Sequence, residues 1–194
     1  MVKVPVAGRV KTRLARDVGT AAATRFVRTA TASLLHRLGR NVPWRLTLAV
    51  TPDAGTGAPV WPGAVPRIAQ GGGDLGARMQ RIMAVRQPGP VVIVGSDVPG
   101  ITRRHISKAF RLLGRHDAVL GPASDGGYWL VGLRRRPRVL RPFGGVRWSG
   151  PHALTDTLFN LSGAAVALLD TLSDVDKGPD LERCSSPGRI VQKK

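Results

Sequence analysis

The stretch Val91-Val92-Ile93-Val94-Gly95-Ser96-Asp97-Val98-Pro99-Gly100 decides the fold of this chain of 194 residues. Four consecutive β-branched apolar residues, bounded by Pro90 and Gly95, predict a short strand that is buried on both faces. A helix is the competing interpretation, but the run is short and its flanking Pro and Gly favour the strand.

A carboxylate, Asp97, follows this strand directly. In open α/β sheets, ligands lie outside the carboxyl ends of the strands, which is where Asp97 falls. A carboxylate in that position suits a hard cation such as Mg²⁺. The alternative is an Asx turn or a helix cap, because Asp is common after strands. Taken alone, Asp97 favours that alternative, and only the other stretches of the chain shift the balance.

Length and composition predict a single domain over residues 1–183, followed by a basic polar tail over residues 184–194. No apolar run approaches the length that spans a bilayer, and the N-terminus lacks an apolar signal core, so we expect a cytoplasmic protein. The single cysteine, Cys184, excludes an internal disulfide. The four histidines show no ligand spacing, which argues against zinc.

The net charge of +18 is the unusual property of the composition. It is typical of proteins that bind nucleic acids or phosphorylated substrates. Apart from Arg134-Arg135-Arg136, the arginines are spread along the chain, and aromatic residues are not interleaved with them. A solvated basic surface is therefore the favoured interpretation, and nucleic acid is not expected as a partner. A nucleic-acid binder ranks last among the functional hypotheses, and its test is salt-dependent binding.

Strand-like and helix-like segments alternate along the chain. Helices are expected from Thr20 to the stop at Gly39, from Leu75, after the cap Thr102 and after the cap Ser149, and strands over residues 44–50, 67–69, 91–94 and 165–169. This alternation predicts an α/β domain of three layers with a mainly parallel sheet.

The N-terminal loop gathers cations. Gly8 allows close approach of the backbone, while Arg9, Lys11 and Arg13 supply positive charge beside the hydroxyl of Thr12. Such a loop suits a diphosphate or triphosphate, although it lacks the Gly-Lys-Ser/Thr ending of a Walker loop. An ordinary basic loop, or a strand, is the alternative.

Two glycine-rich turns are further candidates. The turn that contains Gly72 and Gly73 precedes a helix at Leu75 and suits a base or a phosphate, or is a flexible turn capped by Asp74. The turn at Asp125 precedes Tyr128 and suits the wall of an acceptor site, or is a hairpin. Near the C-terminus, Asp174 and Asp176 point the same way on an extended segment, so both could face one cation.

These motifs together resemble the DUF2064 family of bacterial proteins, also called CofC-like or glycosyltransferase-A-like. The resemblance covers nearly the whole chain and rests on Lys3–Leu14, Gly73–Gly76, Gly95–Gly100, Gly121–Tyr128, Trp148-Ser149, Asp174–Asp176 and Asp180-Leu181. It implies the nucleotide-diphospho-sugar transferase fold. Family members carry an apolar strand before the phosphate loop, whereas here only Met1 to Val4 precede it, so the first strand is expected to be truncated or to start upstream.

The resemblance also implies roles for individual residues. It places nucleotide phosphates at Gly8, Arg9, Lys11 and Arg13, the base or ribose near Gly72, Gly73 and Leu75, and the acceptor beside Asp125, Tyr128 and Trp148. It places Mg²⁺ or Mn²⁺ at Asp97, with Asp176 or Asp174 as a second ligand. The residues expected at the reaction centre are Lys11, Asp97 and Asp125.

The expected function is therefore metal-dependent glycosyl or nucleotidyl transfer from a nucleotide-sugar or a nucleoside triphosphate. The alternatives are an enzyme like phospholactate guanylyltransferase and a nucleotide-binding protein without turnover. The sequence does not identify the acceptor or the catalytic base, and it does not determine whether the protein forms a homo-oligomer.

Overall fold

The computed structural model of the protein describes residues 1–85, 89–137 and 139–185. The elements in chain order are β1 (Val2–Lys3), α1 (Thr12–Val18), α2 (Thr20–Gly39), β2 (Leu48–Thr51), the 3₁₀ helix η1 (Asp53–Gly57), β3 (Arg67–Ala69), α3 (Leu75–Val85), β4 (Val91–Val94), α4 (Arg103–Leu113), β5 (Ala118–Pro122), β6 (Tyr128–Leu133), α5 (Ala153–Asn160), β7 (Val166–Leu168) and α6 (Gly178–Ser185). The predicted tail, 184–194, begins inside α6, and its last nine residues lie outside the described ranges.

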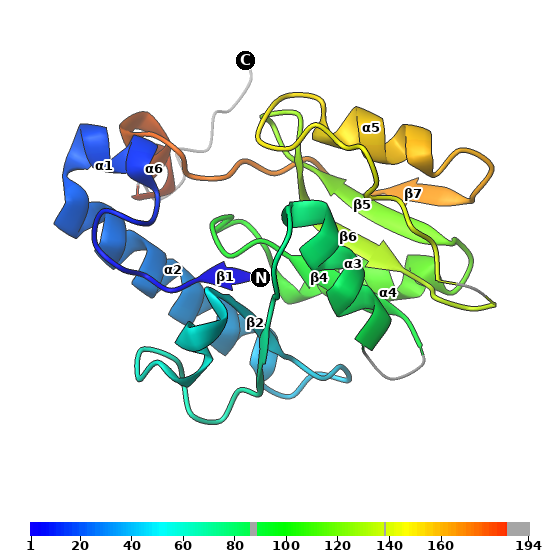
Figure 1. The fold of residues 1–194 in the computed structure, drawn as a ribbon, viewed down its shortest axis with the longest axis horizontal. Coiled ribbons are helices and arrows are strands. Elements are labelled where there is room, and N and C mark those ends of the chain that lie inside the picture. Colours follow the sequence, from blue (N-terminus) through cyan, green and yellow to red (C-terminus); the bar gives the residue numbers. More distant parts are fainter. Residues whose placement is uncertain (86–88, 138, 186–194) are drawn as a thin grey trace, which may run out of the picture.

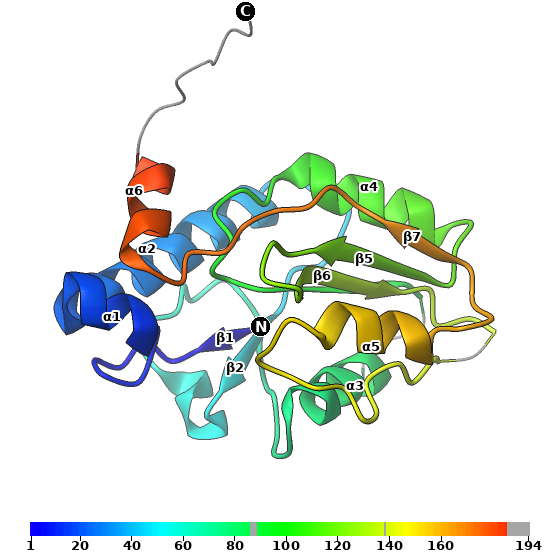
Figure 2. The ribbon, with the colours of Figure 1, turned by 90° about the horizontal axis from the view of Figure 1, so that it is seen from above.

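Strands form the middle of three layers, as the sequence predicts. Helices α2 and α4 cover one face, and α3 and α5 cover the other (Figures 1 and 2). The strands form a parallel sheet in the order β1-β2-β3 and a second sheet in the order β4-β6-β5-β7. In the second sheet β7 is parallel to β5, whereas β6 is antiparallel to both β4 and β5.

The strand predicted from the Val91–Gly100 stretch is confirmed as β4, but its burial differs from the prediction. Only Ile93 is fully buried, whereas Val91, Val92 and Val94 are half-buried. The reason is that β4 pairs with β6 along one edge while its other edge borders an open groove. The run of β-branched residues therefore predicts the strand correctly but does not predict how far its side chains are buried.

The hairpin of β5 and β6 forms the centre of the second sheet. Its turn is the predicted Asp125-Gly126-Gly127 segment, in which Gly126 has a φ of +86°. Gly121 lies directly beneath the indole of Trp129, where a Cβ atom would meet ring atoms at 2.4 Å. The close contact between Gly121 and Trp129 explains why position 121 of β5 is a glycine.

Helix boundaries follow the predictions in some places and depart from them in others. Thr102 caps α4 as expected, and its hydroxyl accepts a hydrogen bond from the amide of His105. Ser149, the expected cap of α5, instead has a φ of +65°, and the helix begins four residues later, after His152. Leu75 opens α3 as expected, and its side chain is 44% exposed at the surface.

Within the described ranges, none of the helices combines the length and the apolar character that crossing a membrane requires.

Candidate functional site

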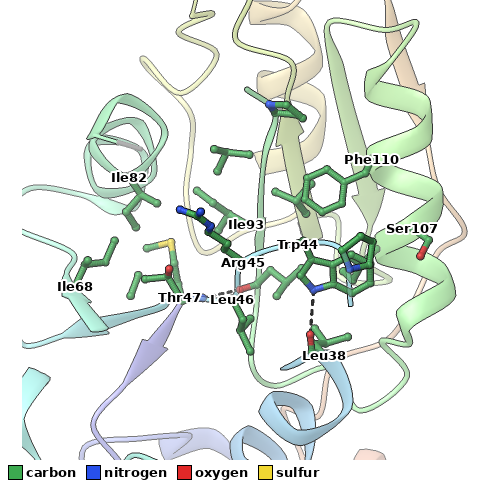
Figure 3. Close-up of a pocket in the computed structure, with 18 residues that line it drawn as sticks. Leu38, Trp44, Arg45, Leu46, Thr47, Ile68, Ile82, Ile93, Ser107 and Phe110 are labelled. Atoms are coloured by element: carbon green, nitrogen blue, oxygen red, sulfur yellow. Dashed lines mark hydrogen bonds between the residues drawn. The ribbon is translucent and has the colours of Figure 1, made fainter. Parts of the chain in front are cut away.

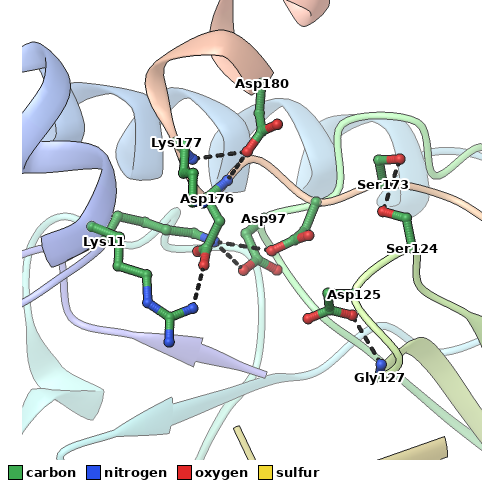
Figure 4. A network of polar contacts seen from close by, with 11 residues as sticks. Lys11, Asp97, Ser124, Asp125, Gly127, Ser173, Asp176, Lys177 and Asp180 are labelled. Carbon is green, nitrogen blue, oxygen red and sulfur yellow. Dashed lines mark hydrogen bonds and ion pairs between the residues drawn. The ribbon is translucent and has the colours of Figure 1, made fainter. Parts of the chain in front are cut away.

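The ammonium group of Lys11 lies among three carboxylates at the end of β4 (Figure 4). Its Nζ atom is 2.7 Å from Asp97, 2.9 Å from Asp176 and 3.5 Å from Asp174. The side chain of Lys11 is only 11% exposed, so the cation is held largely out of water. We call these four residues the lysine–aspartate cluster.

The backbone around Lys11 aims this side chain at the carboxylates. Lys11 has a φ of 44° and a ψ of 52°, in the left-handed region, and it immediately precedes α1. Helix α1 begins at Thr12, so the predicted basic loop is shorter than expected and Arg13 belongs to the helix. The Arg13 guanidinium donates to Asp176 at 2.9 Å, which adds a second cation to one carboxylate.

The other two predicted phosphate-binding residues, Gly8 and Arg9, stand in an exposed turn before Lys11. The amide of Arg9 closes this turn by donating to the carbonyl of Val6 at 3.0 Å. Gly8 has a φ of +75°, and no atom lies within 4 Å of the position of its absent Cβ. The turn thus leaves open space around Gly8, as an approaching phosphate requires.

Backbone contacts bring the two acidic segments together. The amide of Val175 donates to the carbonyl of Asp97 at 3.2 Å, which lays the Asp174–Asp176 segment against the end of β4. Gly95 leaves room for the carboxylate of Asp97, since a Cβ there would lie 3.0 Å from Asp97 Oδ1. The predicted pair of Asp97 and Asp176 therefore meets at one point, with Asp174 beside it.

Burial and charge oppose each other in the cluster. Burial disfavours the Lys11 ammonium, but the charges and hydrogen bonds of Asp97 and Asp176 outweigh it and raise the pKa of Lys11. Burial raises the pKa of Asp174, and the neighbouring carboxylates add to that effect. The pKa of Asp176 is lowered, because Lys11 and Arg13 overcome its partial burial. At neutral pH, Lys11 is therefore a cation held by carboxylates.

The resemblance of the sequence motifs implies a divalent cation, and the donor set of the cluster allows a test of that expectation. Within the described residues, no three His, Cys, Asp or Glu side chains are arranged to hold a metal ion by themselves. Mg²⁺, however, is usually held by one or two carboxylates together with substrate phosphates. Asp97 and Asp176 already converge on one cation, the Lys11 ammonium. The carboxylates of Asp97 and Asp176 thus fit a divalent cation that also binds the phosphates of a substrate, on condition that the Lys11 ammonium leaves its position between them.

The glycine-rich turn between β3 and α3 is held by two arginines that sequence reasoning missed. Arg81 donates to the carbonyls of Gln70 and Gly72 at 2.8 and 3.1 Å, and Arg78 donates to the carbonyl of Gly73 at 2.9 Å. Asp74 accepts from the amide of Ala77, so the capping interpretation of this turn is also realised. Arg78 and Arg81 lie on α3 shortly after the glycines, and this proximity is the feature of the sequence from which their contacts could have been predicted.

The residues predicted on the acceptor side separate into two groups. Asp125 accepts from the amide of Gly127 at 2.9 Å and lies near the cluster without an ion pair to Lys11 (Figure 4). The ring of Tyr128 packs edge-on against that of Trp148, with 6.3 Å between their centres. Burial raises the pKa of Tyr128, whose hydroxyl oxygen accepts from Thr157 on α5. This aromatic pair therefore packs against α5.

Two further aspartates that sequence reasoning assigned no role complete the site. Asp180 accepts from the amides of Asp176 and Lys177 at 3.0 and 2.8 Å, and Asp17 accepts from the amide of Gly178 at 2.7 Å. Through these bonds the start of α6 is fastened to α1 and to the cluster. Their roles depend on contacts across the whole chain, which the local sequence does not reveal.

Comparison with proteins of known structure identifies the fold. A structure from Desulfovibrio desulfuricans G20, provisionally described as a nucleotide-diphospho-sugar transferase, is 31% identical, with a TM-score of 0.84 over 94% of this chain and 83% of that one. Rv0371c from Mycobacterium tuberculosis H37Rv is 16% identical, with a TM-score of 0.58 over 94% and 92% of the two chains. A 4-diphosphocytidyl-2C-methyl-D-erythritol synthase from Anaerococcus prevotii DSM 20548 is 9% identical, with a TM-score of 0.54 over 81% and 83%.

No curated protein matches the sequence. The family described as "uncharacterized protein conserved in bacteria (DUF2064)" matches residues 34–150, which include β4, Asp97 and the β5–β6 hairpin. The structural likeness extends beyond that range, since it covers 94% of this chain. The chain is thus a member of the DUF2064 family and has the fold of the nucleotide-diphospho-sugar transferases.

Proposed function

We propose that this protein is a metal-dependent transferase that uses a nucleoside triphosphate or a nucleotide-sugar as donor. The observation that carries the proposal is the lysine–aspartate cluster, in which the cation of Lys11 meets Asp97 and Asp176 at the carboxyl end of a strand. Ligands of α/β sheets bind at such strand ends. The likeness to a relative provisionally described as a nucleotide-diphospho-sugar transferase supports the same class of donor.

The chemistry follows from the charges in the cluster. Lys11 and Arg13 would bind the phosphates of the donor, and Asp97 and Asp176, released from Lys11, would hold Mg²⁺ or Mn²⁺. When bound, this ion would neutralise the diphosphate and lower the barrier to displacement at phosphorus or at the anomeric carbon. Lys11 would then stabilise the charge that gathers on the leaving group. Asp125 would stand on the acceptor side.

A thermal-shift panel of nucleoside triphosphates and nucleotide-sugars, with and without Mn²⁺, tests the donor. We expect a metal-dependent rise in Tm for one ligand, which is lost in Asp97→Asn. The matched control is Asp170→Asn, because Asp170 also pairs with a lysine but is 65% exposed and lies on the chain after β7. A folded protein whose Tm responds to none of these ligands contradicts the proposal.

The reaction products separate nucleotidyl from glycosyl transfer. Pyrophosphate released from GTP in the presence of phospholactate or another phosphorylated acceptor indicates nucleotidyl transfer, whereas a nucleoside diphosphate released from a nucleotide-sugar indicates glycosyl transfer. Metal-dependent binding without either product, over a wide set of acceptors, would assign the protein to nucleotide binding without turnover.

A further inference from the structure

Helices α2 and α4 form the outer layer on one face of the sheets, and neither helix contains an acidic residue (Figures 1 and 2). All 12 aspartates and glutamates of the chain lie outside these two helices, whereas basic residues occur along both. The net charge of +18 is therefore unevenly distributed over the fold, because these two helices contribute positive charge alone.

The basic side chains of α4 share its outer side. Arg104 and Arg111 are two helical turns apart, with Lys108 between them, so the three side chains lie in one row. Both arginines are exposed, as is Arg115 just after the helix. The opposite side of the helix carries its buried residues, which are Ile106, Ala109 and Leu113. Helix α4 thus presents a row of cations to the solvent.

Helix α2 adds a second group of cations. Arg25 and Arg28 are exposed on this helix, and Arg40 is exposed immediately after it. Lys108 pairs with Asp170 at 3.3 Å, but the six arginines have no acidic partner at ion-pair distance among residues 1–85, 89–137 and 139–185. We call these six residues the basic face: Arg25, Arg28, Arg40, Arg104, Arg111 and Arg115.

The two helices are fixed to each other where the last turn of α2 meets α4. Arg103, at the start of α4, donates to the carbonyl of Arg37 near the end of α2. The indole N–H of Trp44 donates to the carbonyl of Leu38 at 2.9 Å, and its ring stacks on that of Phe110, with 6.0 Å between their centres (Figure 3). The basic face is therefore carried by helices that are held in place.

The chemistry of the basic face favours phosphates over an apolar partner. In the described part of the chain, the large apolar side chains that are exposed lie on other elements, at Val6, Leu75, Val139, Phe159 and Leu168. Helices that lie on membranes combine basic residues with exposed Trp, Phe or Leu, and protein–protein interfaces have an apolar centre. Arginines without such neighbours suit phosphates, because a guanidinium donates two hydrogen bonds to one phosphate.

Double-stranded nucleic acid is the polyanion that matches this face. Proteins bind single strands through exposed aromatic rings on which the bases stack, but Phe26 and Phe110 of α2 and α4 pack against core clusters. Helix α2 has 20 residues and is about 30 Å long, which is close to the roughly 34 Å of one turn of a DNA duplex. A duplex can therefore contact several of the arginines at once.

We propose that the basic face binds the phosphate backbone of a double-stranded nucleic acid without reading its base sequence. The interpretation of the charge as a solvated surface rests on arginines that are spread along the sequence, whereas the fold gathers six of them on one layer. This inference is independent of the proposed transfer reaction, because it uses neither the lysine–aspartate cluster nor a nucleotide donor.

Fluorescence anisotropy with labelled DNA and RNA duplexes of about 20 base pairs, or two helical turns, tests the proposal. Binding to a duplex releases counterions, so the logarithm of the binding constant falls linearly with the logarithm of the salt concentration. For six phosphate contacts the slope is about −5, and doubling the salt weakens binding about 30-fold. Such binding to either duplex supports the proposal, and the tighter duplex identifies the partner. A folded protein that binds neither at about 50 mM salt contradicts it.

Two double variants locate the binding on the protein. Arg104→Gln/Arg111→Gln should reduce the slope to about −3.6, because two phosphate contacts are lost. Arg136→Gln/Arg141→Gln loses the same charge and should keep the wild-type slope, since Leu140 in this segment bonds to α3 on the other face. Arg104→Lys/Arg111→Lys keeps both charges and should also retain the slope. Unfolding curves show whether each variant is folded. Equal losses in the two glutamine variants would assign the binding to net charge and overturn the proposal.

Competition experiments identify other partners, each of which overturns the proposal. If a single strand binds more tightly than the duplex, the protein recognises bases rather than a duplex backbone. If vesicles of phosphatidylglycerol and phosphatidylcholine bind while the duplexes do not, the partner is a membrane. If polyglutamate displaces the duplex as well as unlabelled duplex does, the face binds any polyanion. If GTP with Mn²⁺ displaces the duplex, the duplex occupies the lysine–aspartate cluster instead.

Discussion

The ammonium of Lys11 stands 2.7 Å from the carboxylate of Asp97, one at the start of α1 and the other just after β4. This contact joins the N-terminal part of the chain to the end of β4. Lys11 neutralises carboxylates whose mutual repulsion would otherwise open the site. A residue expected to hold phosphates therefore also holds the unliganded site together.

Replacing Lys11 by Met should destabilise the protein by about 2 kcal/mol. Breaking a fully buried pair costs about 3–5 kcal/mol, and the partial exposure of Asp97 and Asp176 reduces that cost. Urea unfolding measures the change. Lys177→Met is the matched control because Lys177 is exposed and participates through its backbone amide. Equal loss in both variants would show that the carboxylates do not depend on Lys11.

Lys11→Met should also bind Mn²⁺ more tightly than wild type when no nucleotide is present. In the wild-type protein, a metal ion must displace an ammonium that already contacts Asp97 and Asp176. Titration of Mn²⁺, followed by electron paramagnetic resonance, gives both affinities. The further change Asp97→Asn should remove the gain. Weaker Mn²⁺ binding by Lys11→Met would show that Lys11 does not occupy the position of the metal.

Stability should rise between about pH 6 and pH 8 through the α-amino group of Met1. Burial lowers the pKa of this group to about 6 from an ordinary value of 8.0, so the unfolded chain binds more protons in that interval. The stabilisation is complete above pH 8 and is lost as the pH falls to 6. Urea unfolding at both pH values measures it, in protein shown by mass spectrometry to retain Met1. N-terminal acetylation should remove this component, and an unchanged pH dependence after acetylation would assign it to other groups.

Gly71→Ala should destabilise the glycine-rich turn, whereas Gly72→Ala should have little effect. Gly71 has a φ of +76°, and an added Cβ would lie 2.4 Å from the guanidinium of Arg81. The left-handed backbone alone costs roughly 1–2 kcal/mol for a residue with a side chain. Gly72 has no atom within 4 Å of that position. Chemical denaturation compares the two variants, and similar losses in both would show that Arg81 does not fix the turn.

Local patterns predicted the parts of the fold that neighbouring residues determine. The run Val91–Val94 identified β4, and Asp125 with its two glycines identified the β5–β6 hairpin. Ser149 was wrong as a helix cap because its left-handed backbone places it within a turn rather than at the start of α5. Residue type alone does not distinguish these two uses of serine.

The sequence patterns and the family resemblance together singled out Asp97, Asp176 and Lys11, but they did not predict how these residues pair. The structure brings the three together, while their roles in binding stay predictions. In the structure, Lys11 forms ion pairs with the carboxylates instead of leaving its charge unpaired for a phosphate. This pairing depends on the positions of residues that are far apart in the sequence. The same holds for Arg81, whose contact with the glycine-rich turn follows from the orientation of α3.

The hydrogen bond from Gly178 to Asp17, with those from Asp176 and Lys177 to Asp180, has a consequence for biosynthesis. The bond from Gly178 to Asp17 joins segments 161 residues apart, of which one leaves the ribosome early and the other late, whereas the bonds to Asp180 are local. The strands of both sheets can pair while Lys11 still lacks two of its three carboxylates. Premature release of the chain before Asp174 would therefore leave strands that can pair but a cluster without Asp174 and Asp176.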